Sequence, residues 1–312
     1  MKICGIVLNY FSYEDTITCV QTLVDQNELK KIIIVENSAN NAELRVLKDV
    51  FKDNRQVEIL APSQNLGFSG GVNLALNSAI DSCVDAFLLL NNDTLIPQDT
   101  VKKLASGLID NDFDMASPII YCYPEKHKVW VKGYYYNRFG GLITQRNISF
   151  IPGTIFFLSG CCILIHRKIF KDIGLLNTSF FMYGEDVEFC FRAVQKGFRI
   201  GFVDKAHIYH KANASTRHNS FFYEYHIARA HFLLSFCILD HPLKTLLSLL
   251  GKSITLTARA FVRSLRYHNL NPLIALLLAP IPLQIRPKRF KHDTFKKNLK
   301  KREKHGEIGR CR

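Results

Sequence analysis

The cysteines of this 312-residue sequence lack the spacing of a zinc site or a disulfide framework. All nine are scattered, none forms a C-x-x-C pair, and the one adjacent pair, Cys161 and Cys162, lies in an apolar run. This usage is typical of a protein from a reducing compartment. The first residues, MKICGIVLNYF, have one lysine and a short apolar run broken by Asn9. We therefore expect a strand there and not a signal peptide.

Uninterrupted apolar runs long enough to cross a membrane are also missing. Three apolar stretches occur late in the sequence, at 231–239, 242–256 and 272–285. Each is shorter than the roughly 20 apolar residues of a spanning helix, or is interrupted by lysine or proline. Their position before a basic segment is typical of interfacial helices. A packed helical hairpin is the simpler alternative.

Acidic residues are too few to balance the basic ones, which leaves a net charge of +14. The excess is concentrated at 286–312, where twelve Lys/Arg against three Asp/Glu give +9, while residues 1–285 carry the remaining +5. Such a tail can bind nucleic acid or anionic lipid, or be a solvated end. It has two aromatic residues, Phe290 and Phe295, and follows apolar stretches. We therefore expect an anionic membrane surface, and no nucleic acid, as its partner.

Strand and helix patterns alternate through the first 120 residues and predict an α/β fold. Strands are expected at 3–10, 30–37, 56–60 and 86–90, and helices after Ser12, at 42–51 and at 72–80. Apolar strands separated by helices predict right-handed crossovers and a parallel sheet. Ligands bind outside the carboxyl ends of such strands. The polar residues at these ends are Asn9, Glu36, Asn65 and 91–93.

The second half has a less regular pattern. Strands are expected at 115–120, 156–167 and 198–203, with a hairpin or loop at 129–147. A helix is expected from 184 to Gly197, because apolar residues recur there at helical spacing. Its buried side would consist of Val187, Cys190, Phe191 and Val194.

Three short motifs could carry chemistry, and each has a structural alternative. LLLNNDT contains Asp93, which can hold a hard divalent cation or belong to an Asn/Asp turn. NLGFSGGVN contains glycines that let backbone amides approach a ligand, or that form a flexible turn before a helix. In HIYHKANAST, His210 is a candidate metal ligand or phosphate donor, although a single histidine after a strand is more often structural.

The stretch FFMYGEDVEF gathers Glu185, Asp186 and Glu188 at the start of the expected helix. Acidic residues in a first helical turn are favoured by the helix dipole, which accounts for one or two of them. The aromatic residues before them could exclude water, so that one carboxylate acts as a general base. The residues alone leave both interpretations open.

In their order along the chain, these motifs resemble glycosyltransferase family 2, the inverting nucleotide-sugar transferases with the GT-A fold. The matching pieces are VLNY, IIIVENS, NLGFSGGVN, LLLNNDT, LSGCCILIHR, MYGEDVEFCFRA and IYHKANAST, from residue 7 to about 216. The most similar branch is that of bacterial rhamnosyltransferases of surface polysaccharide assembly. The resemblance implies an α/β fold of GT-A (Rossmann-like) type: a mixed, mainly parallel sheet flanked by helices, with a C-terminal helical basic extension.

The resemblance also implies a domain organisation. Residues 1–220 would form the glycosyltransferase domain, with a nucleotide-sugar half at 1–120 and an acceptor half at 121–220. An apolar helical segment at 221–285 and a basic tail at 286–312 would follow.

Roles for individual residues follow from the same resemblance. Asp186 matches the catalytic base, and Glu185 would shape its surroundings, while Glu188 is expected in a structural ion pair. Asp93, at the D-x-D position, and His210 would hold a divalent cation, Mg²⁺ or Mn²⁺. Trp130 and Gly160 would face the acceptor. The nucleotide-sugar would be bound by Asn9, Glu36 (where the family usually has Asp), Asn37, Asn65, Gly67, Phe68, Gly70, Gly71, Asn91 and Asn92.

The activity implied is transfer of a hexose, with rhamnose as one candidate, from a dTDP- or UDP-sugar to a glycan acceptor. A polyprenyl-diphosphate-linked acceptor of O-antigen, capsule or other surface polysaccharide synthesis would place the enzyme on the inner face of the cytoplasmic membrane, as a peripheral cytoplasmic protein. The alternatives are a metal-dependent nucleotide-sugar hydrolase and a nucleic-acid-binding protein that uses the basic tail.

Overall fold

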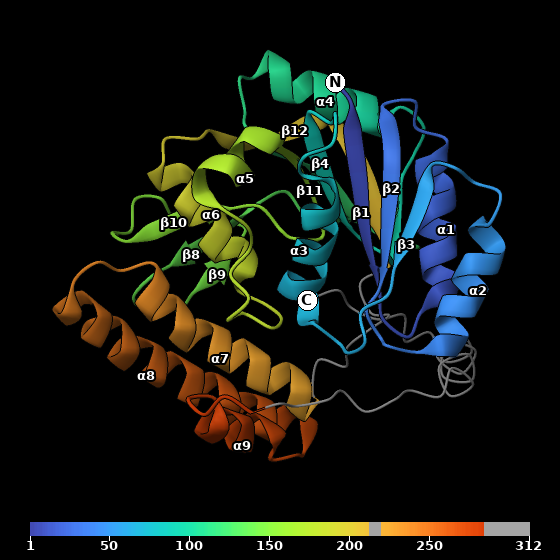
Figure 1. Cartoon of the computed structure of the whole chain (residues 1–312). Helices are drawn as coiled ribbons and strands as arrows, with labels where there is room; N and C mark the ends of the chain where they lie inside the picture. The colour runs from blue at the N-terminus through green and yellow to red at the C-terminus, as the bar shows by residue number, and fades with distance from the viewer. Residues whose placement is uncertain (212–219, 284–312) are drawn as a thin grey trace.

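A mixed, mainly parallel sheet forms the centre of an α/β body (Figure 1). The computed structural model describes residues 1–211 and 220–283. Within them the sheet has the order β3-β2-β1-β4-β11-β6-β12-β5, with β7 beside β6. Its strands are β1 (Ile3–Asn9), β2 (Leu29–Glu36), β3 (Val57–Leu60), β4 (Ala86–Asn91), β5 (Thr94–Leu95), β6 (Met115–Cys122), β7 (Val129–Val131), β11 (Cys162–His166) and β12 (Ile200–His210). The neighbours among β1 to β4 are parallel, as are β6 and β12, whereas β5, β7 and β11 run antiparallel to their neighbours.

A second, small sheet and the helices complete the described fold. The small sheet has the order β10-β8-β9, from β8 (Tyr134–Asn137), β9 (Ile143–Thr144) and β10 (Thr154–Phe157). The helices are α1 (Tyr13–Val24), α2 (Asn41–Phe51), α3 (Gly67–Ala79), α4 (Thr100–Asp110), α5 (Arg167–Ile173), α6 (Glu185–Gln195), α7 (Phe221–Cys237), α8 (Pro242–Tyr267) and α9 (Asn271–Leu278).

Both faces of the main sheet are buried. Alternate side chains of a strand point to opposite faces, and in β1 Cys4 and Ile6 join one hydrophobic cluster while Ile3 and Val7 join the other. The first cluster includes residues of α3, α5 and α6, and the second includes residues of α1, α2 and α4. Strands covered on both faces need continuous apolar sequence, which explains the unbroken runs.

The strand order reverses at β1. β2 and β3 lie on one side of it and β4 lies on the other, so the carboxyl ends of β1 and β4 flank a topological switch point. Asn9 ends β1, Glu36 ends β2 and Asn91 ends β4. The predicted mixed sheet is thus confirmed, and its carboxyl edge gathers the polar residues expected there. The boundary expected at residue 120 falls inside β6, whose neighbours β11 and β12 come from the second half of the chain.

Several predicted element boundaries are wrong. Helix α3 begins at Gly67 and not at 72, because the glycines of NLGFSGGVN already belong to its first turns. The single strand expected at 156–167 is two strands, β10 and β11, which belong to different sheets and are separated by residues 158–161. β12 extends to His210, and α4 and α5 were not expected. Val194 was expected on the buried side of α6 but is 45% exposed. Phe189 and Ala193, which were not expected there, are buried.

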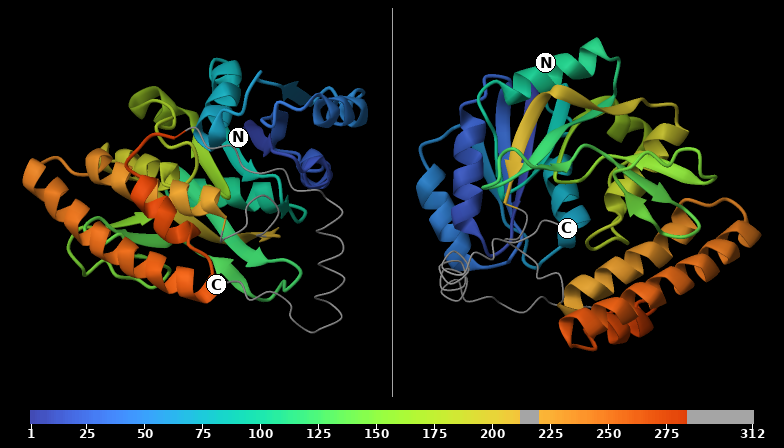
Figure 2. Two further views of the ribbon diagram at one scale, coloured as in Figure 1. Left: turned by 90° about the horizontal axis from the view of Figure 1, so that it is seen from below. Right: turned by 180° about the vertical axis from the view of Figure 1, so that it is seen from behind.

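Helices α7, α8 and α9 form a layer beside the carboxyl edge of the sheet (Figures 1 and 2). The ring of Phe181, just before α6, stacks on His226 of α7 at 5.1 Å between centroids. The apolar stretch at 242–256 was expected to be too short, or too interrupted by lysine or proline, to span a membrane. Helix α8 continues beyond it to Tyr267 and, by length and composition only, is long and apolar enough to cross one. The basic tail, 286–312, lies outside the described residues.

Candidate active site

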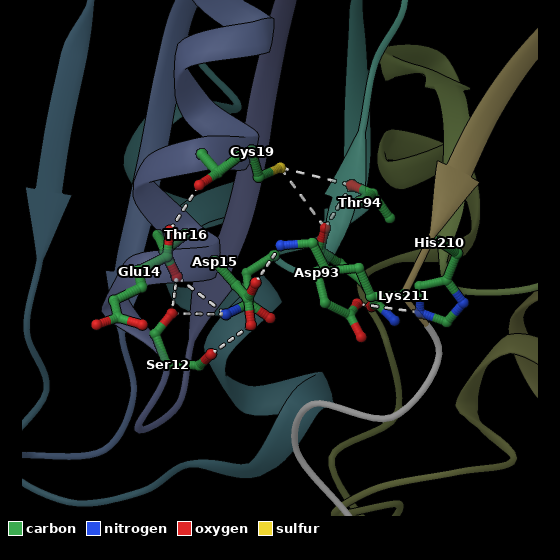
Figure 3. Close-up of polar contacts among 12 residues, drawn as sticks. Ser12, Glu14, Asp15, Thr16, Cys19, Asp93, Thr94, His210 and Lys211 are labelled. Carbon is green, nitrogen blue, oxygen red and sulfur yellow. Dashed lines mark hydrogen bonds and ion pairs between the residues drawn. The ribbon is translucent and has the colours of Figure 1, made fainter. Parts of the chain in front are cut away.

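Asp93 and His210 form a buried pair at the carboxyl edge (Figure 3). Asp93 lies in the turn between β4 and β5, and His210 ends β12, which pairs with β5 through His210 and Thr94. The His210 Nε2 atom lies 3.0 Å from Asp93 Oδ1. Trp130, on β7, places its ring 4.3 Å from the His210 ring, centroid to centroid. The fold therefore brings together three residues that the sequence assigned to the cation and the acceptor.

The pair has the spacing of two metal ligands. In an octahedral Mg²⁺ site with bonds of about 2.0–2.1 Å, neighbouring ligand atoms are about 3 Å apart. Among residues 1–211 and 220–283, no group of three His, Cys, Asp or Glu side chains could hold an ion. The His210 Nδ1 atom is buried and has no hydrogen-bond partner within the same residues. The protein would thus offer two ligands and leave the other positions to substrate oxygens and water.

The two asparagines before Asp93 serve the fold. Asn92 Nδ2 donates to Thr16 Oγ1 at 2.9 Å and to Ser12 O at 3.4 Å, so its side chain is directed to α1. The Asn91 N–H donates to Cys161 O at 2.9 Å, and its carbonyl accepts from Thr94 Oγ1 at 2.7 Å. These four hydrogen bonds hold the turn that carries Asp93.

Sequence reasoning missed a second charged pair beside the first. Lys211 follows His210, and its N–H donates to Asp93 O at 2.9 Å. Its Nζ atom pairs with Asp15 Oδ1 at 2.5 Å, and Ser12 Oγ donates to Asp15 Oδ2 at 2.8 Å (Figure 3). The only signal for Lys211 in the sequence is a cation directly after the candidate metal histidine.

Asn9 and Glu36 are buried and organise the ends of β1 and β2. Asn9 Nδ2 donates to Glu43 Oε2 at 3.0 Å and to Glu36 Oε1 at 3.4 Å, and Asn9 Oδ1 accepts from Thr16 Oγ1 at 2.7 Å. Glu36 accepts from the N–H groups of Ser38 and Asn40 at 3.0 and 3.1 Å. These contacts shape the strand ends on the side predicted to bind the nucleotide.

Asn37 and Asn65 connect the end of β2 to the start of α3. Asn37 Nδ2 donates to Asn65 Oδ1 at 3.1 Å and to Gly67 O at 2.9 Å, while Asn37 Oδ1 accepts from the Leu66 N–H at 3.0 Å. Asn65 Oδ1 also accepts from the Gly67 N–H at 2.8 Å. The amides of Leu66 and Gly67 are therefore used within the fold.

The glycines of this motif permit close packing. Gly67 has φ +73°, and a Cβ there would lie 2.3 Å from the carbonyl oxygen of Phe181. A Cβ on Gly71 would lie 2.8 Å from the Leu8 side chain on β1, and one on Gly70 would lie 2.8 Å from Leu66 Cβ. The Phe68 N–H donates to Phe181 O at 2.7 Å. The start of α3 is thereby joined to the loop before α6.

Asp186 and Glu185 begin α6 directly after Gly184, which has φ +86°. Asp186 accepts from two backbone groups, the Gly160 N–H at 3.2 Å and the Val187 N–H at 2.9 Å. Glu185 is buried, and its Oε2 atom has no hydrogen-bond partner in the part of the chain that the structure describes. The two neighbouring carboxyls therefore have different surroundings.

Burial raises the pKa of both carboxyls. The N–H groups of Gly160 and Val187 oppose this rise in the pKa of Asp186, because they stabilise its charged form. The charge of Asp186 raises the pKa of Glu185 further. The two acids thus differ in their neighbours: Glu185 lies beside the charge of Asp186, whereas Asp186 accepts from two backbone N–H groups that favour its charged form.

Glu188 has the structural role expected of it. It lies on the buried side of α6 and pairs with Arg192, whose Nε donates to Glu188 Oε1 at 2.6 Å. Arg192 also donates to Leu175 O at 2.8 Å. This pair ties α6 to the segment that follows α5.

Residues 160 and 161 connect the carboxylate Asp186 to the Asp93 turn. Gly160 donates to Asp186, and the adjacent Cys161 accepts from Asn91. A Cβ on Gly160 would lie 3.6 Å from the Phe68 ring and 3.8 Å from Asp186 Cβ, so α3 also meets this point. The arrangement combines an ionisable carboxylate of raised pKa with a carboxylate–imidazole pair, as a general base and a cation site require.

Comparison with known proteins identifies relatives of the chain. The family model described as "Glycosyl transferase family 2" matches residues 5–174. The chain is similar to the low-salt glycan biosynthesis hexosyltransferase Agl10 of Haloferax volcanii, with 27% identity over 274 residues that cover 84% of this chain and 86% of the relative.

Solved structures share the fold. A mannosyltransferase, PcManGT of Pyrobaculum calidifontis with GDP-Man and Mn²⁺, aligns with a TM-score of 0.55 and 12% identity over 99% of this chain and 81% of its own. GalNAc-T7 with UDP, GalNAc and Mn²⁺ aligns with a TM-score of 0.59 and 11% identity over 86% of this chain. The chain spans 58% of that enzyme. These alignments confirm the GT-A architecture that the sequence predicted.

Proposed function

Because the chain belongs to glycosyl transferase family 2 and is a glycosyltransferase, we propose that it moves a hexose from a nucleotide donor to a glycan hydroxyl. The transfer would invert the configuration of the anomeric carbon. The observation that carries the proposal is the Asp186 carboxylate. It lies at the start of α6, held by two backbone N–H groups, beside Glu185, whose pKa is raised by burial and by the charge of Asp186. A general base must be held in position, and the two N–H groups both hold the Asp186 carboxylate and favour its charged form.

The proposed reaction forms one bond and breaks one. Asp186 takes the proton of an acceptor hydroxyl, whose oxygen attacks the anomeric carbon of the donor from the face opposite the diphosphate. The bond from that carbon to the diphosphate oxygen breaks, and its electron pair leaves with the nucleoside diphosphate. Burial and the charge of Asp186 both raise the pKa of Glu185, so in this reaction Glu185 would be the protonated neighbour that keeps a second negative charge away from Asp186.

Asp93 and His210 are the residues that would hold a Mg²⁺ or Mn²⁺ ion. When bound, the ion supplies positive charge that neutralises the leaving diphosphate. The 3.0 Å spacing of the two side-chain atoms supports this assignment, as do the Mn²⁺ ions named for PcManGT and GalNAc-T7. Lys211 is tied to the Asp93 turn through its backbone, while its ammonium group is paired with Asp15.

The acceptor side is proposed from Trp130 and Gly160. Trp130 is half-buried and packs against His210, so a sugar in contact with its ring would lie beside the cation site. The donor side would be lined by the ends of β1, β2 and β4 and the start of α3. We assign the predicted nucleotide-sugar residues to it, with Asn9, Glu36, Asn37 and Asn92 acting through the contacts that hold these elements.

The donor and acceptor are proposed at the level of chemical class. The donor is a dTDP- or UDP-hexose, with rhamnose among the sugars to test, and the acceptor is a glycan on a polyprenyl diphosphate. The relative Agl10 is a hexosyltransferase of glycan biosynthesis, which supports a growing glycan as acceptor. Such an acceptor would place the enzyme on the inner face of the cytoplasmic membrane as a peripheral protein.

Donor binding and transfer can be tested separately. Thermal shift against dTDP-, UDP- and GDP-sugars, each with Mg²⁺ or Mn²⁺, should identify one stabilising donor. Transfer of that sugar to a water-soluble glycan acceptor should then require the acceptor for turnover. Equal turnover of donor with and without acceptor would instead identify a hydrolase. Stabilisation by none of the donors would contradict the proposal.

A further inference from the structure

Helix α8 packs with its polar and small residues inward. Every fourth residue from Ser248 to Ser264 is buried: Ser248, Lys252, Leu256, Ala260 and Ser264. A helix on the surface of a soluble protein normally buries its apolar stripe and exposes its polar one. In α8 the pattern is reversed.

The outward face of α8 is an apolar stripe. It consists of Leu243, Leu247, Leu250, Ile254, Phe261 and Leu265, which recur at helical spacing and are 52–72% exposed. Leu270, Ile274, Leu277 and Ile281 extend exposed apolar surface into α9 and the residues after it. Large contiguous apolar surface of this kind marks a contact with another protein or a membrane.

The inner face of α8 is fixed to α7. Lys252 Nζ donates to His231 O at 2.9 Å and to Ser235 Oγ at 2.8 Å. Arg263 and Arg259 both pair with Glu224, a buried residue of α7. A helix that crossed the bilayer would carry this charged face into hydrocarbon, where a charge is costly. The stripe can therefore meet a membrane only if α8 lies along its surface.

Charge favours an anionic leaflet over a second copy of the chain. The six Lys/Arg of residues 221–283 outnumber their two Asp/Glu, although Lys252, Arg259 and Arg263 lie on the inner face of α8, and the tail at 286–312 carries a further net charge of +9. Lys244 and Arg266, near the two ends of α8, are exposed. Two copies joined through this stripe would bring the exposed cations of the two α8 helices together, whereas anionic lipid attracts them.

The layer of α7, α8 and α9 lies beside the carboxyl edge of the sheet (Figures 1 and 2). Asp93 follows β4 at this edge, and Asp186 begins α6, whose preceding Phe181 stacks on α7. We propose that the stripe of α8 and its extension in α9 insert into the headgroup–acyl boundary of an anionic leaflet, with the axis of α8 in the membrane plane. The proposal rests on the proposed function in one respect: a glycan carried by lipid would then stand next to the active site.

Vesicle flotation tests this inference. Wild-type protein is mixed with vesicles of phosphatidylglycerol and phosphatidylcholine, at low salt and at about 1 M NaCl, where the Debye length is about 3 Å. Flotation should persist at high salt, because apolar insertion is not screened. The double variant L250Q/I254Q should lose roughly tenfold or more in vesicle partitioning. The matched control V50Q/I109Q removes two exposed apolar side chains from α2 and α4 and should float like the wild type.

Each other outcome overturns the inference. Flotation lost at high salt and unchanged in L250Q/I254Q would assign the contact to charge alone. A dimer in solution that L250Q/I254Q dissociates, without flotation, would make the stripe an interface between copies. Transfer to a water-soluble acceptor is measured on the same samples, and it should be equal in all of them. A failure of transfer would therefore contradict the proposed function, whereas a failure of flotation would contradict only the proposal that α8 and α9 bind a membrane surface.

Discussion

At the scale of single residues, the start of α6 separates two adjacent carboxyls by their hydrogen bonds. Asp186 accepts from Gly160 and Val187, whereas Glu185 is buried with one oxygen unpartnered among the described residues. Burial raises the pKa of both, the charge of Asp186 raises that of Glu185 further, and the N–H groups of Gly160 and Val187 favour the charged form of Asp186. When two neighbouring acids lie in different surroundings, their pKa values can differ enough for one to act as the base while the other stays protonated.

This asymmetry predicts that replacing each carboxyl by its amide will change the transfer rate by very different amounts. Asp186→Asn should lower the transfer rate by roughly 10²–10⁴-fold, the typical contribution of a positioned base, and leave donor binding intact. Glu185→Gln should retain most activity, because an amide has nearly the shape of the protonated acid. Steady-state kinetics and donor titration on both variants check this. Equal losses in both would show that the charge of Glu185 also takes part, and full activity in Asp186→Asn would exclude Asp186 as the base.

The raised pKa of Asp186 also predicts the acid limb of the pH profile. Asp186 acts as a base only when it is ionised, so kcat should fall as the pH is lowered through its pKa. Because this pKa is raised, the fall should occur at a pH above 3.8, the ordinary pKa of an aspartate. The direction follows from burial, which favours the protonated form. A kcat profile at saturating donor measures the limb. A limb at or below the ordinary aspartate value would contradict the assignment.

Asp93 and His210 predict a shared dependence on divalent metal. Asp93→Ala and His210→Ala should both weaken Mn²⁺ binding in the presence of nucleoside diphosphate, since each removes one of two ligands, and both should raise the donor KM. Calorimetric titration of Mn²⁺ reports binding without turnover. Cys19→Ala, a buried neighbour that contacts Thr94, is a control for disturbance of the turn. Unchanged Mn²⁺ affinity in both ligand variants would leave the diphosphate to Lys211 and other cations.

Site residues were predictable where they end strands. Asp93 and Asn9 follow apolar runs, and the carboxyl ends of neighbouring strands meet at one edge, so their proximity follows from the pattern. The ion pair of Lys211 with Asp15 joins residues 196 positions apart and has no motif, so it required the fold. The hydrogen bond from Asn92 to Thr16 of α1 could not be predicted either, because an asparagine after a strand has no preferred partner in the sequence.

At the scale of elements, strands with continuous apolar runs were predicted well, and turns near the site were not. The start of α3 at Gly67 depends on Asn65 accepting from the Gly67 N–H, a local contact that glycine-rich sequence does not reveal. The break between β10 and β11 at 158–161 places Gly160 and Cys161 against Asp186 and Asn91, although the surrounding sequence is apolar. For α8, helical spacing predicts an apolar stripe, but its outward direction follows from the contacts of Lys252 and Glu224 with neighbouring helices.

The packing of α7 on α8 predicts a pH-dependent stability. Lys252 is fully buried, and burial lowers its pKa from 10.5 to about 7. Between these values the unfolded chain binds more protons than the folded one, so the free energy of unfolding rises with pH. Of the groups beside it, His231 stays neutral here because burial lowers its pKa to about 3, and burial raises the pKa of Tyr136 above the window.

Lys252→Met should abolish this rise. From pH 7 to about pH 9 the wild type should gain about 2 kcal/mol relative to the variant, from roughly 1.4 kcal/mol per pKa unit. Urea unfolding at a series of pH values measures the difference. Lys244→Met is the control, because Lys244 is exposed on the same helix and should follow the wild-type profile. Parallel profiles for Lys252→Met and wild type would mean that Lys252 remains charged in the folded protein.

At the scale of the whole molecule, charge and apolar surface are both concentrated toward the C-terminal end of the chain. The tail at 286–312 carries +9 of the net +14, and α8 and α9 carry the exposed apolar stripe. The sequence predicted both features. Their relation to the site depends on the fold, which places the α7–α9 layer beside the carboxyl edge. Two attractions to an anionic leaflet would then act on the protein: that of the basic tail, which salt screens, and that of the apolar stripe, which salt does not screen.

Deletion of 286–312 should remove only the screened part. Each Lys or Arg near an anionic surface contributes about 1 kcal/mol, so contact by a few of the twelve is enough for a measurable effect. The deletion should lower sedimentation with anionic vesicles and activity on a lipid-linked acceptor at low salt. Activity on a short water-soluble acceptor should be unchanged. A chain of full length with the tail lysines and arginines changed to glutamine is the control, and it should behave like the deletion if charge is the cause. Vesicle binding that ignores both the deletion and the salt concentration would leave the contact to the apolar stripe alone.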